Sequence, residues 1–344
     1  MRARRGALMT QSATILGCEG SRLGTDEAAF FREADPLGFI LFARNVETPD
    51  QLRRLTGDLR AAVGREAPIL VDQEGGRVQR LGAPHWREWL PPLDQVARTA
   101  PEAMERGLYL RYRLIAAELR AVGIDANCAP TADIAGQDTH PFLKNRCFGA
   151  DAATVTRAAR ASAEGLLQGG VLPVMKHLPG HGRAVVDSHL QLPRVGAALG
   201  DLDATDFAPF RALADLPMAM TAHIVFDAVD AERPATASAA AIALIRDRIG
   251  FGGLLMTDDL SMEALSGTLG ERAAAGIAAG CDIALYCKGI RAEAEAVVVA
   301  SGHLSGAAAA RAEQALACRR PPDAIDTALL EAELEALLMG RVHG

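Results

Sequence analysis

The 344-residue chain lacks the features that mark several large classes of protein. Its formal net charge of −7 argues against nucleic acid or an anionic membrane as partner, because both need a concentrated basic face. We find no run of about 18 apolar residues and no apolar core of a secretion signal, so we expect neither a transmembrane helix nor export. The six cysteines form no CxxC pair. We therefore predict reduced thiols in a cytoplasmic protein.

Lysine is scarce, and glycine-rich phosphate loops are missing. The only lysines are Lys144, Lys176 and Lys288, and all other cationic side chains of this kind are arginines. This bias toward arginine suggests that lysine is kept where a compact ammonium is needed. No GxGxxG or GxxxxGK[ST] motif follows an apolar run, so nucleotide binding has no support and we expect no cofactor.

Short apolar runs alternate with helix-length amphipathic stretches along the whole chain. Eight such runs predict strands, at residues 13–18, 39–42, 68–72, 124–130, 172–176, 217–223, 253–258 and 282–287. The stretches 49–62, 101–121, 152–167, 239–248 and 271–279 predict helices. This alternation requires parallel strands joined by crossover helices, either as an eight-stranded barrel or as an open doubly wound sheet.

Two observations favour the barrel. The strand count fits, and polar residues stand at the C-terminal ends of many runs, as in Asp72, Asp133 and Asp258. A barrel assembles its site from several strand ends, whereas a doubly wound sheet concentrates its ligand at one point. We predict a disordered segment over residues 1–10 and a single (β/α)8 domain over 11–344, with a C-terminal helix near 323–338 packed outside.

The loop after the fifth run, KHLPGHGRAVVDSH, carries the densest polar cluster. Asp187 and His189 stand two residues apart, which in an extended segment puts both side chains on one side. A carboxylate on one ring nitrogen fixes the tautomer and leaves the other nitrogen to transfer a proton near neutral pH. The alternative is a surface pair without a role.

The same loop raises the possibility of a metal site. His177, His181 and His189 could group as neutral ligands. However, a Pro-Gly pair interrupts the helix that HxxxH spacing requires, so a metal site is disfavoured. We interpret Gly180 and Gly182 as hinges that let the loop close over a substrate.

Two further clusters contain aspartates at strand ends. Asp258 and Asp259 end the seventh run; adjacent strand residues face opposite sides, so one would point into a cavity and the other could cap the next helix. Asp72 and Arg80 combine an acceptor with a directional donor, which suits a clamp on vicinal hydroxyls. A surface ion pair is the alternative.

Taken in order, DQEGGRVQR, NRCFG, KHLPGHG, DSH, MTAH and TDDLSM resemble glycoside hydrolase family 3, specifically the single-domain bacterial β-N-acetylhexosaminidases of peptidoglycan recycling. The match runs from about residue 15 to residue 285, and the family's fold is a (β/α)8-type barrel. Leu178 stands where an aromatic residue is commoner, and Cys147 where a small residue is usual. Neither departure removes a required functional group.

The resemblance assigns the nucleophile to Asp258 and the general acid/base to His189, paired with Asp187. Five residues match the family positions that bind N-acetylglucosamine: Asp72, Arg80, Arg146, Lys176 and His177. By analogy with the family, His223 lies near the same pocket. The implied enzyme is a retaining exo-β-N-acetylglucosaminidase that cleaves terminal N-acetylglucosamine from muropeptides containing 1,6-anhydro-N-acetylmuramic acid. A neutral imidazole acid does not repel the Asp258 carboxylate, and its pKa near 6.5 needs little tuning.

Several alternatives stay open. The substrate's acetamido oxygen could replace Asp258 as nucleophile, with Asp258 and Asp259 as the acid and orienting pair, or phosphate could replace water. A metal-dependent amidohydrolase would use the loop histidines, and a sugar-binding protein would need only the clamp. We expect a monomer that acts on a small muropeptide or chitooligosaccharide and binds no nucleic acid, membrane or metal.

Overall fold

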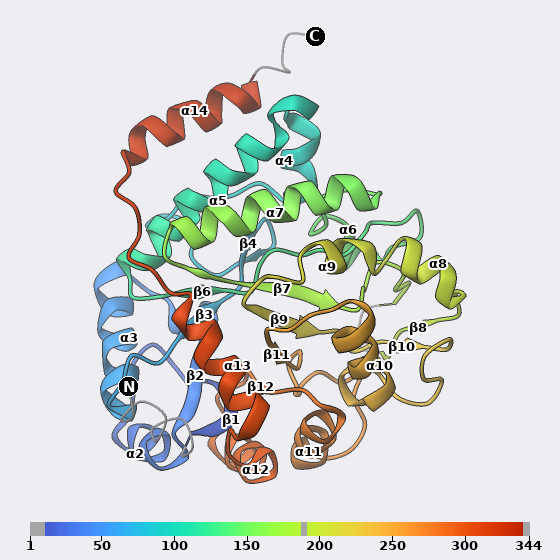
Figure 1. Ribbon diagram of the computed structural model, residues 1–344. Helices are drawn as coiled ribbons and strands as arrows, with labels where there is room; N and C mark the ends of the chain where they lie inside the picture. Colours follow the sequence, from blue (N-terminus) through green and yellow to red (C-terminus); the bar gives the residue numbers. More distant parts are fainter. Residues whose placement is uncertain (1–10, 187–190, 340–344) are drawn as a thin grey trace.

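Eight parallel strands form the centre of the computed structural model, which describes residues 11–186 and 191–339 (Figure 1). In sheet order the strands are β12 (Ala284–Tyr286), β1 (Ser12–Gly17), β2 (Pro36–Leu41), β3 (Ile69–Val71), β6 (Ala126–Asn127), β7 (Leu172–Leu178), β9 (Met218–Thr221) and β11 (Leu254–Met256). A parallel bridge between Met256 and Ile283 joins β11 to the residue before β12 and closes the ring. Each predicted strand region overlaps one of these strands, so the barrel prediction is confirmed.

Side chains alternate between the two faces of the barrel wall. Ile15 and Ile40 belong to one buried cluster, whose members include residues of the central pocket described below. Leu16 and Phe39, their neighbours in sequence, belong to the second cluster, between the strands and the surrounding helices. Parallel strands covered by helices bury both faces, which explains why β1, β2 and β7 contain no exposed residue.

Helices surround this sheet. The larger ones are α2 (Thr25–Ala34), α3 (Pro49–Val63), α5 (Met104–Ala121), α7 (Ala152–Gln168), α11 (Leu269–Ala279), α12 (Arg291–Ser301), α13 (Gly306–Ala317) and α14 (Thr327–Met339). Their ends follow the sequence: α3 begins after Thr48, whose hydroxyl accepts the Gln51 N–H, and ends at Gly64 in the left-handed region. The stretch predicted as one helix over 239–248 divides into α10 (Ala239–Ala243) and a π-type turn, η4 (Leu244–Arg248).

Short elements complete the described chain. The helices are α4 (Pro92–Arg98), α6 (Pro141–Lys144), α8 (Leu199–Ala204) and α9 (Ala208–Ala212), and the 3-10 turns are η1 (Ala43–Asn45), η2 (Pro101–Ala103) and η3 (Ala235–Ala237). The hairpin β4 (Gln73–Gly75) and β5 (Val78–Gln79) follows β3, and β8 (Arg194–Val195) pairs with β10 (Val225–Phe226).

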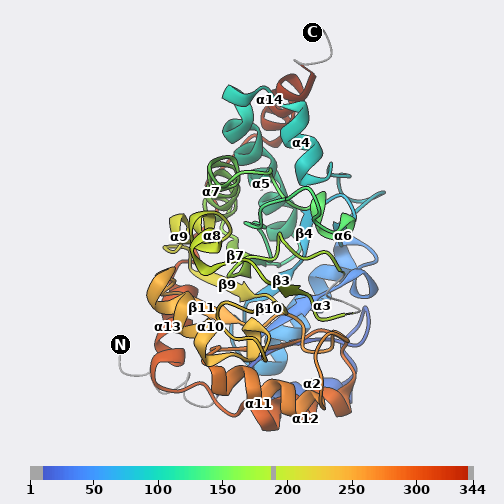
Figure 2. The same cartoon turned by 90° about the vertical axis from the view of Figure 1, so that its right-hand side faces the viewer.

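The last helix, α14, lies outside the ring against α5 and α4, at the end of the molecule opposite α11 and α12 (Figure 2). Its Leu334 is buried, and Glu333 forms an ion pair with Arg106 of α5. The structure does not describe residues 1–10, so the prediction of disorder there lies outside its range. A search of the described helices finds none with the length and apolarity to cross a bilayer.

Candidate active site

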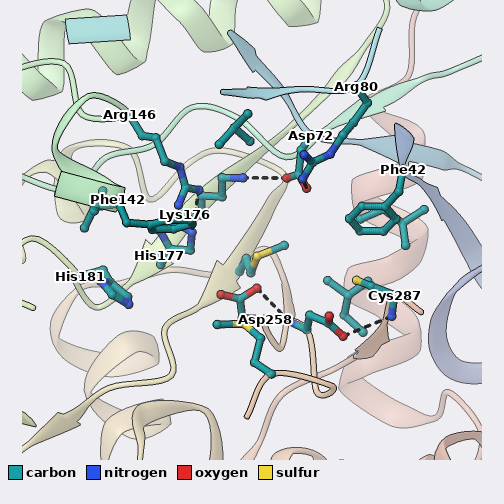
Figure 3. Close-up of a pocket in the computed structure, with 17 residues that line it drawn as sticks. Phe42, Asp72, Arg80, Phe142, Arg146, Lys176, His177, His181, Asp258 and Cys287 are labelled. Carbon is teal, nitrogen blue, oxygen red and sulfur yellow. Dashed lines mark hydrogen bonds and ion pairs between the residues drawn. The ribbon is translucent and has the colours of Figure 1, made fainter. Parts of the chain in front are cut away.

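The carboxyl ends of the barrel strands surround a cavity, here called the central pocket, with about 720 Å³ of empty space including its open mouth. Among the predicted site residues, those that line it are Asp72, Arg80, Arg146, Lys176, His177 and Asp258 (Figure 3). They come from segments far apart in the sequence, so the fold assembles the cluster that the motifs indicated.

Lys176 connects the two acidic residues that follow β3. Its ammonium lies 2.9 Å from Asp72 Oδ1 and 2.6 Å from Glu74 Oε1, and the Arg80 guanidinium donates to Asp72 Oδ2 at 2.9 Å. Burial acts to raise the pKa of the Asp72 carboxyl, but the charges of Lys176 and Arg80 outweigh burial and hold that pKa well below its usual range. Asp72 is therefore an ionised acceptor within the pocket.

Sequence reasoning missed Glu74, which is 1% exposed. Its two oxygens accept from Arg146 Nε at 2.9 Å and Nη2 at 2.8 Å, a bidentate pair. Burial opposes ionisation, but Arg146 and Lys176 together lower the pKa of Glu74 to about 2. Glu74 thus holds two cations of the pocket wall in place. Its only sequence signal was an acidic residue two positions after a predicted strand.

Asp133, at a predicted strand end, orients His177. Its Oδ2 lies 2.7 Å from His177 Nδ1, and the Arg146 guanidinium lies 3.4 Å from His177 Nε2. Because a guanidinium only donates, Nε2 accepts and the ring proton is on Nδ1. The peptide bond between Lys176 and His177 is cis, and both side chains line the pocket.

Asp258 and Asp259 follow β11 and have different environments. The Asp258 Oδ1 accepts the Asp259 backbone N–H at 2.8 Å. Asp259 accepts the hydroxyl and N–H of Ser261 and the N–H of Cys287, which ties its loop to the end of β12. The expectation that one aspartate caps the next helix is wrong: α11 begins ten residues later, and Thr268 caps it.

The Asp258 carboxyl is held ionised. Burial acts to raise its pKa, but His223, His177, the Asp259 N–H and Lys176 outweigh burial, so that the pKa lies below its usual range. Figure 3 places Asp258 across the pocket from Lys176 and Asp72. A ligand in the pocket therefore lies between this carboxylate and the polar wall.

His223 is fully buried and is not among the residues that line the pocket. Its Nε2 lies 3.0 Å from the Asp259 carbonyl oxygen, which only accepts, so Nε2 carries the proton. Its Nδ1 lies 2.8 Å from the Thr236 hydroxyl. Burial lowers the pKa of this imidazole, which favours the neutral form. His223 is thus placed to position the Asp258–Asp259 segment.

The first part of the loop after β7 is pinned to its surroundings. The His181 N–H donates to Asp133 Oδ1 at 2.6 Å, and a Cβ on Gly182 would lie 1.9 Å from the Ile134 carbonyl oxygen. Close packing, rather than hinge freedom, requires glycine at Gly182. The predicted dyad of Asp187 and His189 lies outside the described residues.

Two phenylalanines that were not among the predicted site residues, Phe42 and Phe142, line the pocket. Arg80 lies 5.2 Å from the ring centroid of Phe42, and Arg146 lies 5.3 Å from that of Phe142. The described part of the chain contains no group of three or more His, Cys, Asp or Glu side chains arranged to hold a metal ion.

A barrel pocket that sets an ionised carboxylate opposite fixed hydrogen-bonding groups suits a sugar and fits the class of glycoside hydrolases. The model of the "Glycosyl hydrolase family 3 N terminal domain" matches residues 22–317. The chain belongs to glycosyl hydrolase family 3, as its motifs predicted.

Similar proteins share most of their length with this chain. The β-hexosaminidase of Alkalilimnicola ehrlichii is 39% identical over 281 residues, which are 79% of this chain and 80% of that protein. Native NagZ from Neisseria gonorrhoeae is 31% identical, with a TM-score of 0.81 and 96% of both chains covered. The structure of the same protein in complex with N-trifluoroacetyl-D-glucosamine gives a TM-score of 0.81 and 30% identity, again over 96% of both chains.

Proposed function

We propose that the chain is a retaining exo-β-N-acetylglucosaminidase that releases terminal N-acetylglucosamine from muropeptides containing 1,6-anhydro-N-acetylmuramic acid. The observation that carries the proposal is the Asp258 carboxylate, held ionised in the central pocket opposite the Lys176 and Asp72 side chains. The family, the β-hexosaminidase relatives and the glucosamine derivative bound by a structural relative support the same sugar.

In this proposal Asp258 attacks the anomeric carbon and forms a covalent glycosyl-enzyme. The hydrogen bond from the Asp259 N–H occupies one lone pair of Oδ1 and leaves Oδ2 as the attacking oxygen. His189, oriented by Asp187, protonates the leaving oxygen and then activates the water that releases the sugar. Asp72 and Arg80 would hold the sugar hydroxyls as acceptor and donor.

The polar wall around Lys176 is fixed before any ligand arrives. Lys176, Arg146 and Arg80 each already hold a carboxylate, so their donors keep one geometry. Pre-positioned donors bind hydroxyls without the entropy cost of ordering long side chains. This wall supports the assignment of Arg146, Lys176 and His177 to the non-reacting end of the sugar.

A second cavity adjoins the central pocket, and we assign the leaving group to it. Phe42, Asp259, Met262 and Cys287 line both spaces, and Arg44, Ser261, Glu263 and Lys288 line only the second. Lys288 is exposed, and its ammonium forms no ion pair within the described part of the chain. On a disaccharide that carries no peptide, its ammonium would pair with the free lactyl carboxylate of the muramic acid leaving group, and the Glu263 carboxylate in the same cavity would repel that group.

Trapping tests the proposal directly. The enzyme is incubated with a fluorinated N-acetylglucosaminyl donor that carries a good leaving group, and its peptides are examined by mass spectrometry. One sugar on the peptide that contains Asp258 is the expected result. Inhibition by a thiazoline without any labelled peptide would instead favour attack by the acetamido oxygen.

The remaining alternatives have their own measurements. Product analysis with and without phosphate separates hydrolysis from phosphorolysis, and resistance to a chelator counts against a metal-dependent amidohydrolase. A cytoplasmic monomer remains part of the proposal. Its six cysteines are free thiols, five of them buried, which supports a reducing compartment.

A further inference from the structure

One buried histidine of the central pocket has unpaired ring nitrogens. His181 is 6% exposed, and neither Nδ1 nor Nε2 has a hydrogen-bond partner in the described structure. By contrast, His177 and His223 each have partners at both ring nitrogens. A buried donor and acceptor without partners destabilise a folded protein, so such groups call for a ligand or another explanation.

The His181 ring is fixed in the pocket wall. Its backbone N–H is held by Asp133, and its ring packs edge-on against His177 with centroids 5.6 Å apart. The ring lines the central pocket, and Figure 3 shows it beside His177 on the side away from Phe42. The His181 ring therefore lines the same space as the Asp258 carboxylate, although its two nitrogens are themselves buried.

His181 presents an uncharged surface to that space. Burial and the neighbouring His177 lower the pKa of the imidazole to about 4, although Asp133 and Asp258 act in the opposite direction. A neutral imidazole offers one donor and one acceptor. A hydroxyl or an amide can pair with either the donor or the acceptor nitrogen of the ring. A carboxylate can pair only with the donor nitrogen, and an ammonium ion only with the acceptor nitrogen.

We propose that His181 binds an uncharged hydroxyl or amide of the sugar close to the anomeric carbon, an inference that rests on the function proposed above. A sugar whose anomeric carbon lies over Asp258 brings its 2-acetamido group and its 6-hydroxyl near that carboxylate. Both groups have the required chemistry. The contact makes His181 a residue that selects the sugar.

The test replaces His181 by leucine and by asparagine. His181→Leu removes the two unpaired atoms, so its melting temperature should equal or exceed that of the wild type, while kcat/KM on 4-nitrophenyl β-N-acetylglucosaminide falls about tenfold. His181→Asn restores a donor and an acceptor and should recover part of the activity. The matched control, His223→Leu, should melt at a lower temperature because it removes the hydrogen bond to the buried Thr236 hydroxyl and the one that the Asp259 carbonyl accepts.

Two modified substrates identify the group that His181 contacts. If His181 contacts the 6-hydroxyl, His181→Leu and the wild type should have equal activity on the 6-deoxy substrate. If His181 contacts the acetamido group, the two proteins should have equal activity on the 2-deoxy substrate. An undiminished loss on both, or full activity of His181→Leu on the parent substrate, overturns the inference. These outcomes leave the proposed function standing, because that function fails only if the wild-type enzyme releases no N-acetylglucosamine or forms no adduct at Asp258.

Discussion

Replacing Glu74 by glutamine should strongly destabilise the protein. The substitution keeps the size of the side chain but removes the charge that pairs with Arg146 and Lys176 inside the barrel mouth. The Glu74 pKa of about 2, against an ordinary 4.5, corresponds to about 3 kcal/mol of folding free energy at neutral pH. Breaking a buried ion pair costs a similar amount, about 3–5 kcal/mol.

The matched control is Glu333→Gln on α14. Glu333 accepts from Arg106 Nε at 2.7 Å and Nη2 at 2.8 Å, the same bidentate geometry as the buried pair. The two side chains are 39% and 50% exposed, so water screens their charges. Losing an exposed pair should cost less than about 1 kcal/mol. The two variants therefore separate the effect of burial from that of geometry.

Urea unfolding at several pH values measures both effects. A carboxyl with a depressed folded pKa contributes its full stability above the unfolded value and loses it as pH falls through the folded value. The difference between wild type and Glu74→Gln should therefore be constant above about pH 5 and shrink between pH 4.5 and pH 2. A Glu74→Gln protein no less stable at neutral pH than Glu333→Gln would refute the reasoning.

Three further predictions follow from single residues. Asp258→Ala should fold normally and lose turnover, and more than a few per cent of the wild-type rate would exclude Asp258 as nucleophile. Lys288→Met should lower kcat/KM about threefold on a disaccharide with a lactyl carboxylate and leave 4-nitrophenyl substrates unaffected, as expected for an exposed charge pair; equal effects on both would contradict the leaving-group assignment. Thr268→Ala removes the reciprocal cap with Glu271 and should cost about 1 kcal/mol in urea unfolding, with kcat unchanged.

The barrel could be predicted because its determinants are local. Each strand is a short apolar run, and each helix has an amphipathic face and end signals such as Thr48 and Gly64. The sequence did not indicate that the stretch after Ala239 leaves the α-helix at Leu244. The cap prediction at Asp258 and Asp259 failed because a loop separates them from α11, whose cap is Thr268.

Residues of the candidate site could be predicted only where they belong to a recognisable sequence motif. Glu74 escaped notice because its partners Arg146 and Lys176 are distant in sequence, so its burial depends on long-range pairing. The sequence singled out His181 as one of three candidate metal ligands. Only the structure shows that its ring nitrogens have no partner and that it lines the same pocket as Asp258. The roles assigned to Asp187 and His189 remain predictions from the motif.

The closure of the barrel between β11 and β12 has a consequence for the motions of the enzyme. One parallel bridge and a few backbone hydrogen bonds join them, among them the one from the Asp282 N–H to the Leu255 carbonyl. Side chains supply further bonds: Asp282 accepts the Leu255 N–H, and the Thr257 hydroxyl accepts the Leu285 N–H. Asp282 is also held by Arg246 and Arg311. This seam lies directly before Asp258 in the chain. Amide hydrogen exchange at Leu255 and Leu285 would therefore report how often the ring opens beside the reacting carboxylate.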